Sequence, residues 1–334
     1  MAIFITGATG FIGKKLAQRL ASQGEVVHVL ARDPKKAADL THANIKVFKG
    51  DILEPESLAA AIKGCDQVYH VASFVDIWSK DPATPFVVNV EGTVNVLQAC
   101  ENEGVKKVVV TSTAGVFGPS HGPEVDEDSV RRTDFFFRYE TSKFMAEEKV
   151  QHFARKGMNV VIVNPTRVFG PGEMSKSNSW VMLIAMLVNK GITFIPGKGN
   201  KSGNYVFVDD VLEGHILAME KGERGEKYIL GGENATMNEL LQMVREESGR
   251  KGVVIRMPLF ILFSIAKLQD WKANIFKRPP LITTPFTKRY MVNWANSNKK
   301  AKEKLGFQPL SLREGIRKTV EWIRQMEAEK KNKK

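Results

Sequence analysis

The sequence predicts a doubly wound α/β fold built on a parallel sheet, and three observations carry this prediction. Short β-branched runs alternate with amphipathic stretches through the first half, these runs are apolar at nearly every position, and the first of them leads straight into a glycine-rich turn. Alternating strands and helices favour a parallel sheet, and strands buried on both faces lack the usual polar–apolar alternation. We therefore expect a Rossmann-type domain followed by a smaller, mostly helical C-terminal domain.

The expected elements follow one another at short intervals. Strands are expected over residues 3–6, 26–30, 45–48, 67–70, 107–111 and 160–163. Beyond residue 166, loops rich in glycine and proline enclose an expected helix over 178–190, which indicates a second domain. The apolar runs 206–208 and 228–230 are expected strands that return to the first sheet. The predicted domains are therefore 1–170, to which 205–231 returns, and a second domain over 171–204 and 232–334.

Composition and charge exclude several functional classes. Cys65 and Cys100 lie far apart in the sequence, so they provide neither a disulfide framework nor a thiolate zinc site. We expect a reducing, cytoplasmic location and no leader peptide, because the sequence opens on an apolar strand. The 49 basic and 37 acidic side chains give a net charge of +12, but no zinc finger or RNA-binding signature accompanies it. We expect no nucleic-acid partner, and no metal, because the histidines lack ligand spacing.

The segment 257–268 is apolar and has basic neighbours. A membrane span needs about 20 apolar residues, so this segment is too short to cross a bilayer. It could lie in the surface of a membrane as an interfacial helix. We favour a core or pocket-lining helix instead, because a small domain must bury an apolar face. The basic neighbours are Lys251, Arg256, Lys272, Lys277 and Arg278.

The glycine-rich turn predicts a dinucleotide site. It reads Thr6-Gly7-Ala8-Thr9-Gly10-Phe11-Ile12-Gly13 and precedes a helical stretch over 14–22. In such a unit Gly7 permits the tight turn, Gly10 lets the backbone approach the phosphates, and Gly13 lets helix and strand pack closely. Because strand, turn and helix agree in position, a dinucleotide site is favoured over an ordinary turn.

The end of the second expected strand indicates which dinucleotide binds. NAD-selective proteins usually carry an acid there for the ribose 2′-hydroxyl, whereas this sequence has Ala31. Arg32 and Lys35 supply positive charge suited to a 2′-phosphate, which an arginine can bind with two hydrogen bonds. We expect NADP(H); NAD(H) stays open because Asp33 offers a carboxylate next to this position.

In the order of its motifs, the sequence resembles the extended short-chain dehydrogenase/reductase family over nearly its whole length, in the branch of dihydroflavonol reductase and the 3β-hydroxysteroid dehydrogenases. Beside the glycine turn, the resemblance is carried by Gly50-Asp51-Ile52, Tyr69-His70-Val71-Ala72-Ser73, Asn89-Val90-Glu91-Gly92-Thr93, the segment 111–118 and Tyr139-Glu140-Thr141-Ser142-Lys143. The catalytic residues it implies are Thr113, Tyr139, Lys143 and Ser112. The cofactor-binding residues it implies are Gly7, Thr9, Gly10, Phe11, Ile12, Gly13, Arg32, Lys35, Asp51, Ile52, Val71, Ala72, Ser73, Asn89, Thr111, Tyr139, Lys143, Pro165 and Val168. A homodimer is usual for the family.

Tyr139 and Lys143 carry the expected chemistry. Positions four apart on a helix share a face, so Lys143 is expected beside Tyr139. Tyrosine has a pKa of about 10, and we expect the neighbouring ammonium and the positive nicotinamide to lower it into a useful acid/base range. Tyr139 then protonates a carbonyl oxygen as hydride arrives, or deprotonates an alcohol in the reverse direction. Thr113, where the family more often has serine, is expected to hydrogen-bond the same oxygen.

The surrounding residues favour one reaction of the family. Sugar dehydratases carry an Asp-Glu pair where this sequence has Ala114-Gly115, and sugar epimerases carry an arginine just before the segment that begins here at Asn204. Apolar residues expected at the substrate pocket are Phe135, Phe136, Phe137, Met182, Phe260, Leu262 and Phe263. Such residues suit an aromatic, acyl or terpenoid carbonyl compound better than a sugar nucleotide.

We therefore expect an oxidoreductase that reduces a ketone or aldehyde on a hydrophobic small molecule with NADPH, or runs the reverse oxidation. One alternative is an NAD-dependent nucleotide-sugar epimerase. The other is a sensor or scaffold that binds NADP(H) without catalysis; such proteins typically lack the tyrosine or the lysine, and this sequence has both.

Overall fold

Seven parallel strands form the main sheet of the computed structural model, which describes residues 2–174 and 178–332. Their order across the sheet is β10-β6-β5-β4-β1-β2-β3. The bounds are β1 Ala2–Thr6, β2 Val26–Ala31, β3 Ile45–Lys49, β4 Cys65–His70, β5 Lys107–Thr111, β6 Val160–Pro165 and β10 Lys227–Leu230. The predicted Rossmann-type sheet and its six expected strands are confirmed, each to within two residues at either end.

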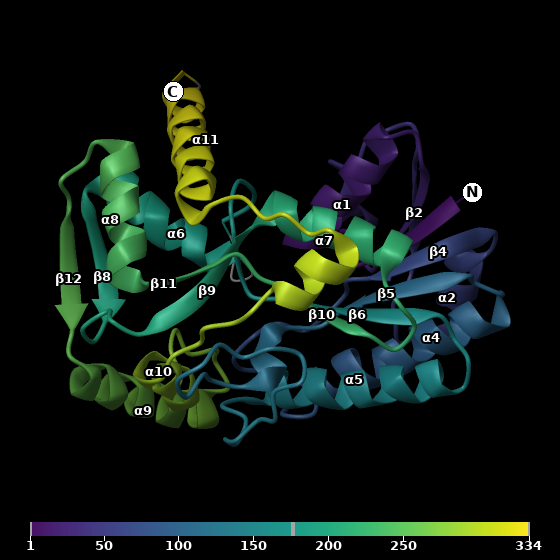
Figure 1. Cartoon of the computed structure of the whole chain (residues 1–334), viewed down its shortest axis with the longest axis horizontal. Coiled ribbons are helices and arrows are strands. Elements are labelled where there is room, and N and C mark those ends of the chain that lie inside the picture. The colour runs from purple at the N-terminus through teal and green to yellow at the C-terminus, as the bar shows by residue number, and fades with distance from the viewer. Residues whose placement is uncertain (1, 175–177, 333–334) are drawn as a thin grey trace.

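Helices cover both faces of this sheet because alternate residues of each strand point to opposite sides. Ile3 and Ile5 pack in one core with α1 (Phe11–Ser22) and α7 (Val208–Lys221). Phe4 packs in the other core with α2 (Pro55–Ile62), α4 (Gly92–Asn102) and α5 (Arg138–Arg155). Figure 1 shows α1 and α7 above the strands and α5 below them. Burial on both faces explains why the strand sequences are apolar throughout.

The second part of the structure is built on two small sheets and helices. The three-stranded sheet has the order β11-β9-β7, and a parallel pair joins β12 to β8. The strand bounds are β7 Arg167–Phe169, β8 Ile192–Pro196, β9 Ser202–Phe207, β11 Glu233–Thr236 and β12 Val253–Met257. The packing helices are α6 Ser179–Ala185, α8 Met237–Ser248 and α11 Leu312–Asn332. These elements form the left half of Figure 1.

One expected strand pairs differently from the prediction. The run 206–208 was expected in the main sheet, but β9 pairs with β7 and β11, and Val208 already begins α7. The reason is that β7 leaves the end of β6 and offers a parallel partner, with Val168 opposite Val206. The part of 205–231 that does return to the sheet consists of α7, which packs on it, and β10, which pairs with β6.

The apolar segment 257–268 does not form a core helix, but its first residues, Pro258, Leu259 and Phe260, line a cavity, which is the other form that we favoured. Met257 ends β12, and the helix that follows, α9 (Leu259–Phe276), lies on the surface beside the short α10 (Thr284–Lys288). Ala266 and Ala273 are its buried residues. A buried helix and a helix with an exposed apolar face can have the same apolar composition, so the sequence alone could not distinguish them. None of the described helices is long and apolar enough to span a membrane.

The order of the strands positions the functional site. From β1 the chain proceeds to β2 and β3 on one side, and then crosses to β4, β5 and β6 on the other. The loops after β1 and β4 therefore diverge at the carboxyl edge of the sheet. In sheets of this kind ligands bind at that switch point.

Candidate active site

The turn after β1 forms a cradle that a side chain would fill. Gly7 has a φ of 74°, and a Cβ there would lie 2.6 Å from the amide nitrogen of Ala72 in the loop after β4. A Cβ on Gly13 would lie 2.4 Å from the Gly7 carbonyl oxygen. Gly10 is the N-cap of α1, which has no side-chain cap and no acid in its first turn. The open, positive helix end fits a dinucleotide diphosphate.

Neighbouring residues fix the shape of this cradle. The Phe11 ring is buried beneath Gly172, where an added Cβ would lie 2.6 Å from the ring. The Thr6 hydroxyl accepts a hydrogen bond from the amide of Ala72 at 3.1 Å. Thr9 at the tip of the turn is exposed, and Ile12 packs on the core beneath it.

The residues after β2 and β3 line the expected adenosine end. Arg32 is exposed, and no ion pair joins it to an acid among the described residues. The Asp33 carboxylate accepts a hydrogen bond from the Lys35 amide at 3.0 Å and so caps the 3-10 turn Pro34–Ala37. The Asp51 carboxylate accepts from the amide of Leu53 at 3.1 Å. Both carboxylates thus already accept a backbone hydrogen bond, and Asp33 does so at the turn where a ribose would bind.

Asn89 ties the loop after β4 to the helix that carries Tyr139. Its Oδ1 accepts hydrogen bonds from the Ser73 hydroxyl at 3.1 Å and the Phe74 amide at 2.7 Å. Its Nδ2 donates to the Ser142 hydroxyl at 2.9 Å and the Phe74 carbonyl at 3.1 Å. The side chain of Asn89 is therefore used within the protein, so it acts on the expected site by positioning the Val71–Ser73 loop and α5.

Thr113 and Tyr139 come together at the carboxyl edge of the sheet. Thr113 follows β5 and caps the 3-10 turn Ala114–Phe117, with its hydroxyl accepting from the Gly115 amide at 3.2 Å. Tyr139 is the second residue of α5, and its ring stacks on Phe137 with centroids 6.1 Å apart. Burial raises the pKa of Tyr139 to about 12, although a hydrogen bond with Thr113 and the charge of Arg289 oppose that rise. The two predicted reactive hydroxyls are thus in contact.

Lys143 lies one turn further along α5 but does not lower the pKa of Tyr139 as we expected. Its ammonium is buried and donates to the Thr111 carbonyl oxygen at 2.7 Å. Burial lowers the pKa of Lys143 to about 8, against the opposing effect of Glu147. In this protein the positive group that lowers the pKa of Tyr139 is Arg289. The hydrogen-bond partner of the ammonium is the Thr111 carbonyl and not the Tyr139 hydroxyl.

The other expected residues of this edge are buried around the two hydroxyls. The hydroxyl of Ser112 is buried and has no hydrogen-bond partner among the described residues. The Thr111 hydroxyl forms a hydrogen bond with Nε2 of His215 at 2.8 Å, so the partner of the Thr111 side chain is a residue of α7. Pro165 ends β6 and is buried, and Val168 in β7 packs against the core.

A buried carboxylate that the sequence did not reveal organises the neighbourhood of Tyr139. Glu140 accepts from Nη2 of Arg131 at 3.1 Å, and Arg289 lies 3.4 Å from its other oxygen. Arg131 also donates to the Gly115 carbonyl at 2.6 Å, which ties the Thr113 turn to α5. Arg289 lies over the rings of Phe137 and Trp294. Arg289 lies far from Glu140 in the sequence, so no local pattern could have predicted that the two residues form an ion pair.

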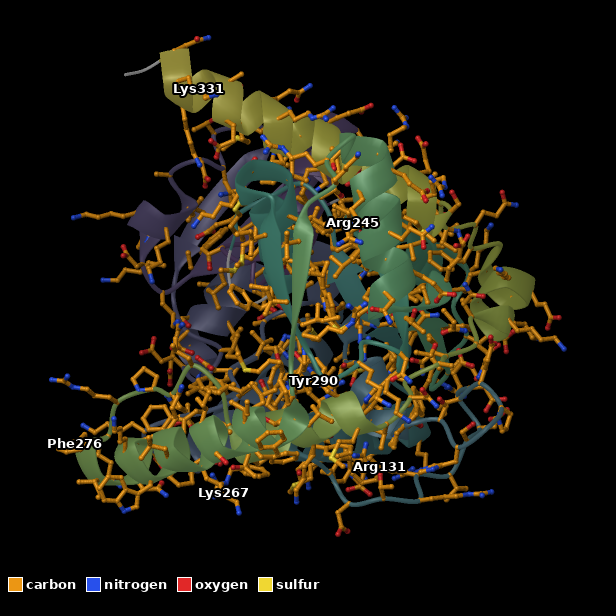
Figure 2. All side chains as sticks on the ribbon, turned by 90° about the vertical axis from the view of Figure 1, so that its left-hand side faces the viewer. Arg131, Arg245, Lys267, Phe276, Tyr290 and Lys331 are labelled. Atoms are coloured by element: carbon orange, nitrogen blue, oxygen red, sulfur yellow. The ribbon has the colours of Figure 1, made fainter. Side chains whose placement is uncertain are left out.

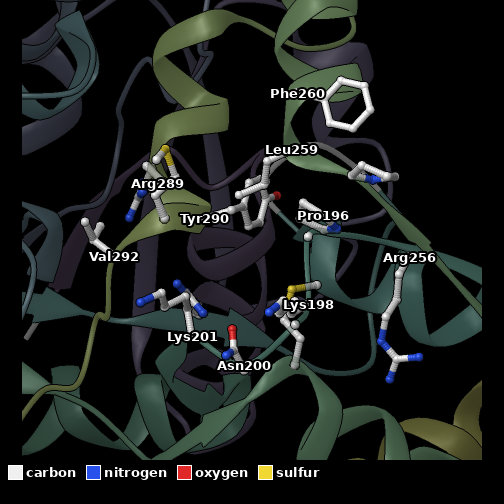
Figure 3. A pocket seen from close by; sticks show the side chains of 16 residues that line it. Pro196, Lys198, Asn200, Lys201, Arg256, Leu259, Phe260, Arg289, Tyr290 and Val292 are labelled. Atoms are coloured by element: carbon white, nitrogen blue, oxygen red, sulfur yellow. The ribbon is translucent and has the colours of Figure 1, made fainter.

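A cavity of about 700 Å³ opens beside this cluster. Figure 3 shows Arg289, Lys201 and Lys198 around it, with Arg256 further out and Leu259 near Tyr290. Its cationic lining residues are Arg167, Lys198, Lys201, Arg256 and Arg289, and its apolar lining includes Pro196, Met237, Pro258, Leu259, Phe260, Met291 and Val292. No acid lines it among the described residues. The cavity therefore offers both apolar surface and positive charge.

The aromatic residues expected in the pocket are distributed differently. Phe260 lines this cavity. Phe135 packs against Phe144, Phe136 packs against Trp294, and Phe137 stacks on Tyr139. The remaining expected residues, Met182, Leu262 and Phe263, are not part of its lining. Of the three consecutive phenylalanines, Phe137 is thus the one that touches the reactive tyrosine.

Comparison with known proteins gives relatives over nearly the full chain. The family model described as NAD dependent epimerase/dehydratase family matches residues 3–231. Sterol demethylase protein B of Methylococcus capsulatus is 30% identical, covering 97% of this chain and 99% of its own. A putative dihydroflavonol 4-reductase of Synechocystis is 28% identical, covering 96% and 94%.

Solved structures agree with this family over the same length. The structure of gox2253 has a TM-score of 0.80 at 32% identity, covering 97% of this chain and 98% of its own. UDP-glucose 4-epimerase of Thermotoga maritima, solved with UDP-glucose, has a TM-score of 0.82 at 25% identity, covering 98% and 99%. Similarity of fold therefore extends over both halves of the chain.

Proposed function

Because the chain belongs to the NAD-dependent epimerase/dehydratase family, an NAD(P)-dependent family of oxidoreductases and epimerases, we propose that it is an NADPH-dependent reductase. Its substrate is a ketone or aldehyde on a largely hydrophobic small molecule, and Tyr139 is the acid/base. Two effects on Tyr139 carry the proposal. It is hydrogen-bonded to Thr113, and the charge of Arg289, which lines the cavity, lowers its pKa. The proton donor is thus linked to the cavity through Arg289, and its helix is linked through Asn89 to the loop that abuts the glycine turn.

The protein's own groups account for the proton transfer. A carbonyl oxygen that accepts hydrogen bonds from Thr113 and Tyr139 is polarised before reaction. When bound, the dinucleotide supplies the hydride for the carbonyl carbon. Tyr139 is protonated at neutral pH because burial raises its pKa to about 12, so it can deliver a proton to the forming alkoxide. Arg289 and the Thr113 hydroxyl then stabilise the phenolate, since both lower the pKa of Tyr139.

Two features favour reduction over the sugar chemistry of the family. The acidic pair of dehydratases is replaced by Ala114 and Gly115, and Ala114 is buried. Asn204 is also buried, and its amide donates to the Gly232 and Asn296 carbonyls and to the Asn234 side chain. It therefore contributes to the internal packing of the second half and has no free group for a diphosphate.

The preference for NADPH is supported by the residues after β2. Arg32 is exposed and without an acidic partner in the described part of the chain, so its guanidinium can bind a 2′-phosphate. Asp33, the alternative ribose ligand for NAD, is held as the cap of the following turn.

A nucleotide-sugar epimerase is the second candidate because of the charge of the cavity. Five cations and no described acid line it, and such a surface attracts a diphosphate. The structural similarity to UDP-glucose 4-epimerase agrees with this candidate. The two candidates differ in the substrate that they assign to the cavity. Both assign the acid/base role to Tyr139.

The experiment that separates them is NADPH oxidation across a panel of apolar ketones and aldehydes, with and without a carboxylate or phosphate group. NADH and UDP-sugars are tested in parallel. Tyr139→Phe is expected to lower turnover by at least ~100-fold, whereas Tyr228→Phe, in β10, is expected to leave it unchanged. Carbonyl-dependent NADPH loss that depends on Tyr139 supports the reductase. No reaction with carbonyls, together with inversion of a sugar nucleotide, would refute the reductase and favour the epimerase.

A further inference from the structure

Helix α9 presents an apolar surface to solvent. From residue 261 to residue 275 its exposed apolar side chains recur every three or four residues, and one neighbour at each end of this run widens the face that they share. They are Phe260, Ile261, Ile265, Leu268, Trp271, Ile275 and Phe276, with exposed fractions from 38% for Ile265 to 73% for Phe260. Figure 2 shows α9 along the lower edge of the molecule, with nothing beneath it. Contiguous apolar surface of this kind marks an interaction site.

The inner face of α9 includes small and polar groups. Ala266 and Ala273 are its buried residues. Gln269 accepts hydrogen bonds from the amides of Leu281 and Ile282, and Asp270 accepts from the amide of Thr284 at 2.9 Å. The helix is thus anchored by polar contacts and small residues, with Leu262 and Phe263 half-buried, while most of its large apolar side chains face solvent. Burial of its outer face requires a partner.

Positive charge accompanies the apolar face. Lys267 and Lys272 lie on α9, and Lys277 and Arg278 follow its end directly. All four are exposed, and no ion pair holds any of them within the described ranges 2–174 and 178–332. The carboxylate of α9, Asp270, is directed to the Thr284 amide on the inner side. The surface therefore combines aromatic and aliphatic side chains with free cations.

We propose that α9 docks the protein onto an anionic lipid bilayer, with the axis of the helix in the plane of the membrane. Apolar side chains enter the boundary between headgroups and acyl chains, and the indole of Trp271 suits that polar–apolar interface. The lysines extend their ammonium groups to lipid phosphates while their methylenes stay in the apolar layer. The docking is independent of the reaction proposed for Tyr139.

Charge complementarity favours a bilayer over a second copy of the chain. A twofold contact through α9 places the same surface of both copies face to face. Lys267 and Lys272 would then approach their own copies, and neither lysine has an ion-pair partner among the described residues to compensate. An anionic bilayer supplies the missing negative charge and buries the same apolar side chains.

Docking also brings the cavity to the membrane. Pro258, Leu259 and Phe260, at the start of α9, belong to the cavity lining. When α9 lies in the bilayer surface, this part of the cavity wall is at the lipid boundary. An amphiphilic substrate could then pass between membrane and cavity without crossing open water.

Sedimentation of the full-length protein with vesicles tests the docking directly. We expect binding to phosphatidylcholine–phosphatidylserine vesicles that weakens with added salt and is much weaker on pure phosphatidylcholine. Lys267→Gln with Lys272→Gln is expected to weaken the partition by about 30-fold. The matched control, Lys330→Gln with Lys331→Gln at the end of α11, makes the same charge change elsewhere and is expected to bind as the wild type does.

The apolar face has its own pair of variants. Leu268→Glu with Trp271→Glu is expected to abolish vesicle binding, whereas Val26→Glu, at the start of β2, is expected to leave it unchanged. Brominated lipid is expected to quench tryptophan emission in the wild type but far less in Trp271→Phe. The thermal unfolding of each variant checks that it is folded.

Three results would overturn the proposal. One is a wild-type protein that does not sediment with anionic vesicles. Another is vesicle binding that the α9 variants leave intact. The third is a dimer in analytical ultracentrifugation that Leu268→Glu with Trp271→Glu dissociates, in the absence of lipid binding, because this assigns the face to a second copy.

Discussion

Replacement of Lys143 by methionine should make the protein more stable while it removes activity. Methionine has a similar length and no charge, so it can occupy the buried channel of the lysine side chain. Lys143 is buried in the folded protein, where its ammonium has one hydrogen-bond acceptor, the Thr111 carbonyl at 2.7 Å. A group held for its chemistry at such a position should reduce stability.

The magnitude follows from the pKa of the lysine. Burial lowers it from the usual 10.5 to about 8. Each unit corresponds to about 1.4 kcal/mol, so the charged form costs the folded protein about 3 kcal/mol at neutral pH. Loss of the hydrogen bond to the Thr111 carbonyl offsets about 1 kcal/mol of this in the variant. We expect Lys143→Met to raise the free energy of unfolding by about 2 kcal/mol.

The pH dependence of this difference has a definite sign. Below pH 8, Lys143 is charged in both the folded and the unfolded state, so the full cost is present. Between pH 8 and 10.5 the folded protein has released the proton while the unfolded chain still binds it, so the stability of the wild type rises with pH. The methionine variant lacks this rise. Its advantage should therefore shrink from pH 8 upward and vanish near the unfolded pKa.

Urea unfolding of the nucleotide-free protein at neutral and alkaline pH measures both effects. The matched control is Lys149→Met, an exposed lysine on the same helix, for which we expect little change at any pH. Carbonyl-dependent NADPH oxidation should be lost in Lys143→Met and kept in Lys149→Met. If Lys143→Met is no more stable than the wild type at neutral pH, or if its advantage is the same at all pH values, the assignment of a costly buried ammonium is wrong.

Three further substitutions test other parts of the site. Arg32→Ala should weaken binding of NADPH but not of NADH, measured by calorimetric titration; an unchanged preference would remove Arg32 from the cofactor site. Gly13→Ala should lose dinucleotide binding, because its Cβ would lie 2.4 Å from the Gly7 carbonyl oxygen; a titration that matches the wild type contradicts the cradle. Glu140→Gln should lower the free energy of unfolding by about 3 kcal/mol, because Arg131 and Arg289 lose their buried counter-charge. The exposed Glu148→Gln on the same helix is its control, and equal stability of the two would show that Glu140 is dispensable.

The features that the sequence predicted well are those that depend on local pattern. The strands of the main sheet are continuous apolar runs, and the turn from Gly7 to Gly13 is defined by contacts within itself and with two neighbouring loops. The contact of Thr113 with Tyr139 joins two motifs whose order along the chain already indicated a shared site. In each case short-range chemistry leaves few alternatives.

The features that it did not predict depend on partners from elsewhere in the chain. The pairing of β9 was decided by β7, a strand of three residues that has no distinctive pattern. The pKa of Tyr139 depends on Arg289, which reaches it from the second half of the chain, while the ammonium of Lys143 is held by the Thr111 carbonyl. The exposure of α9 depends on which of its side chains α10 covers, and the amino-acid composition does not indicate that.

The charges around Tyr139 explain how a buried phenol can act as an acid. Each of two buried acids on α5 meets two bases: Glu140 lies against Arg131 and Arg289, while Glu147 is within 2.6 Å of Lys227 and acts on Lys143. Each group therefore keeps one net positive charge. Before reaction, burial keeps the phenol of Tyr139 protonated. After proton transfer, the phenolate is stabilised by the charge of Arg289 and by the hydrogen bond with Thr113, both of which are in place before the reaction. Charge and hydrogen bonding that are set in advance for the product of proton transfer are the condition for catalysis by a preorganised site.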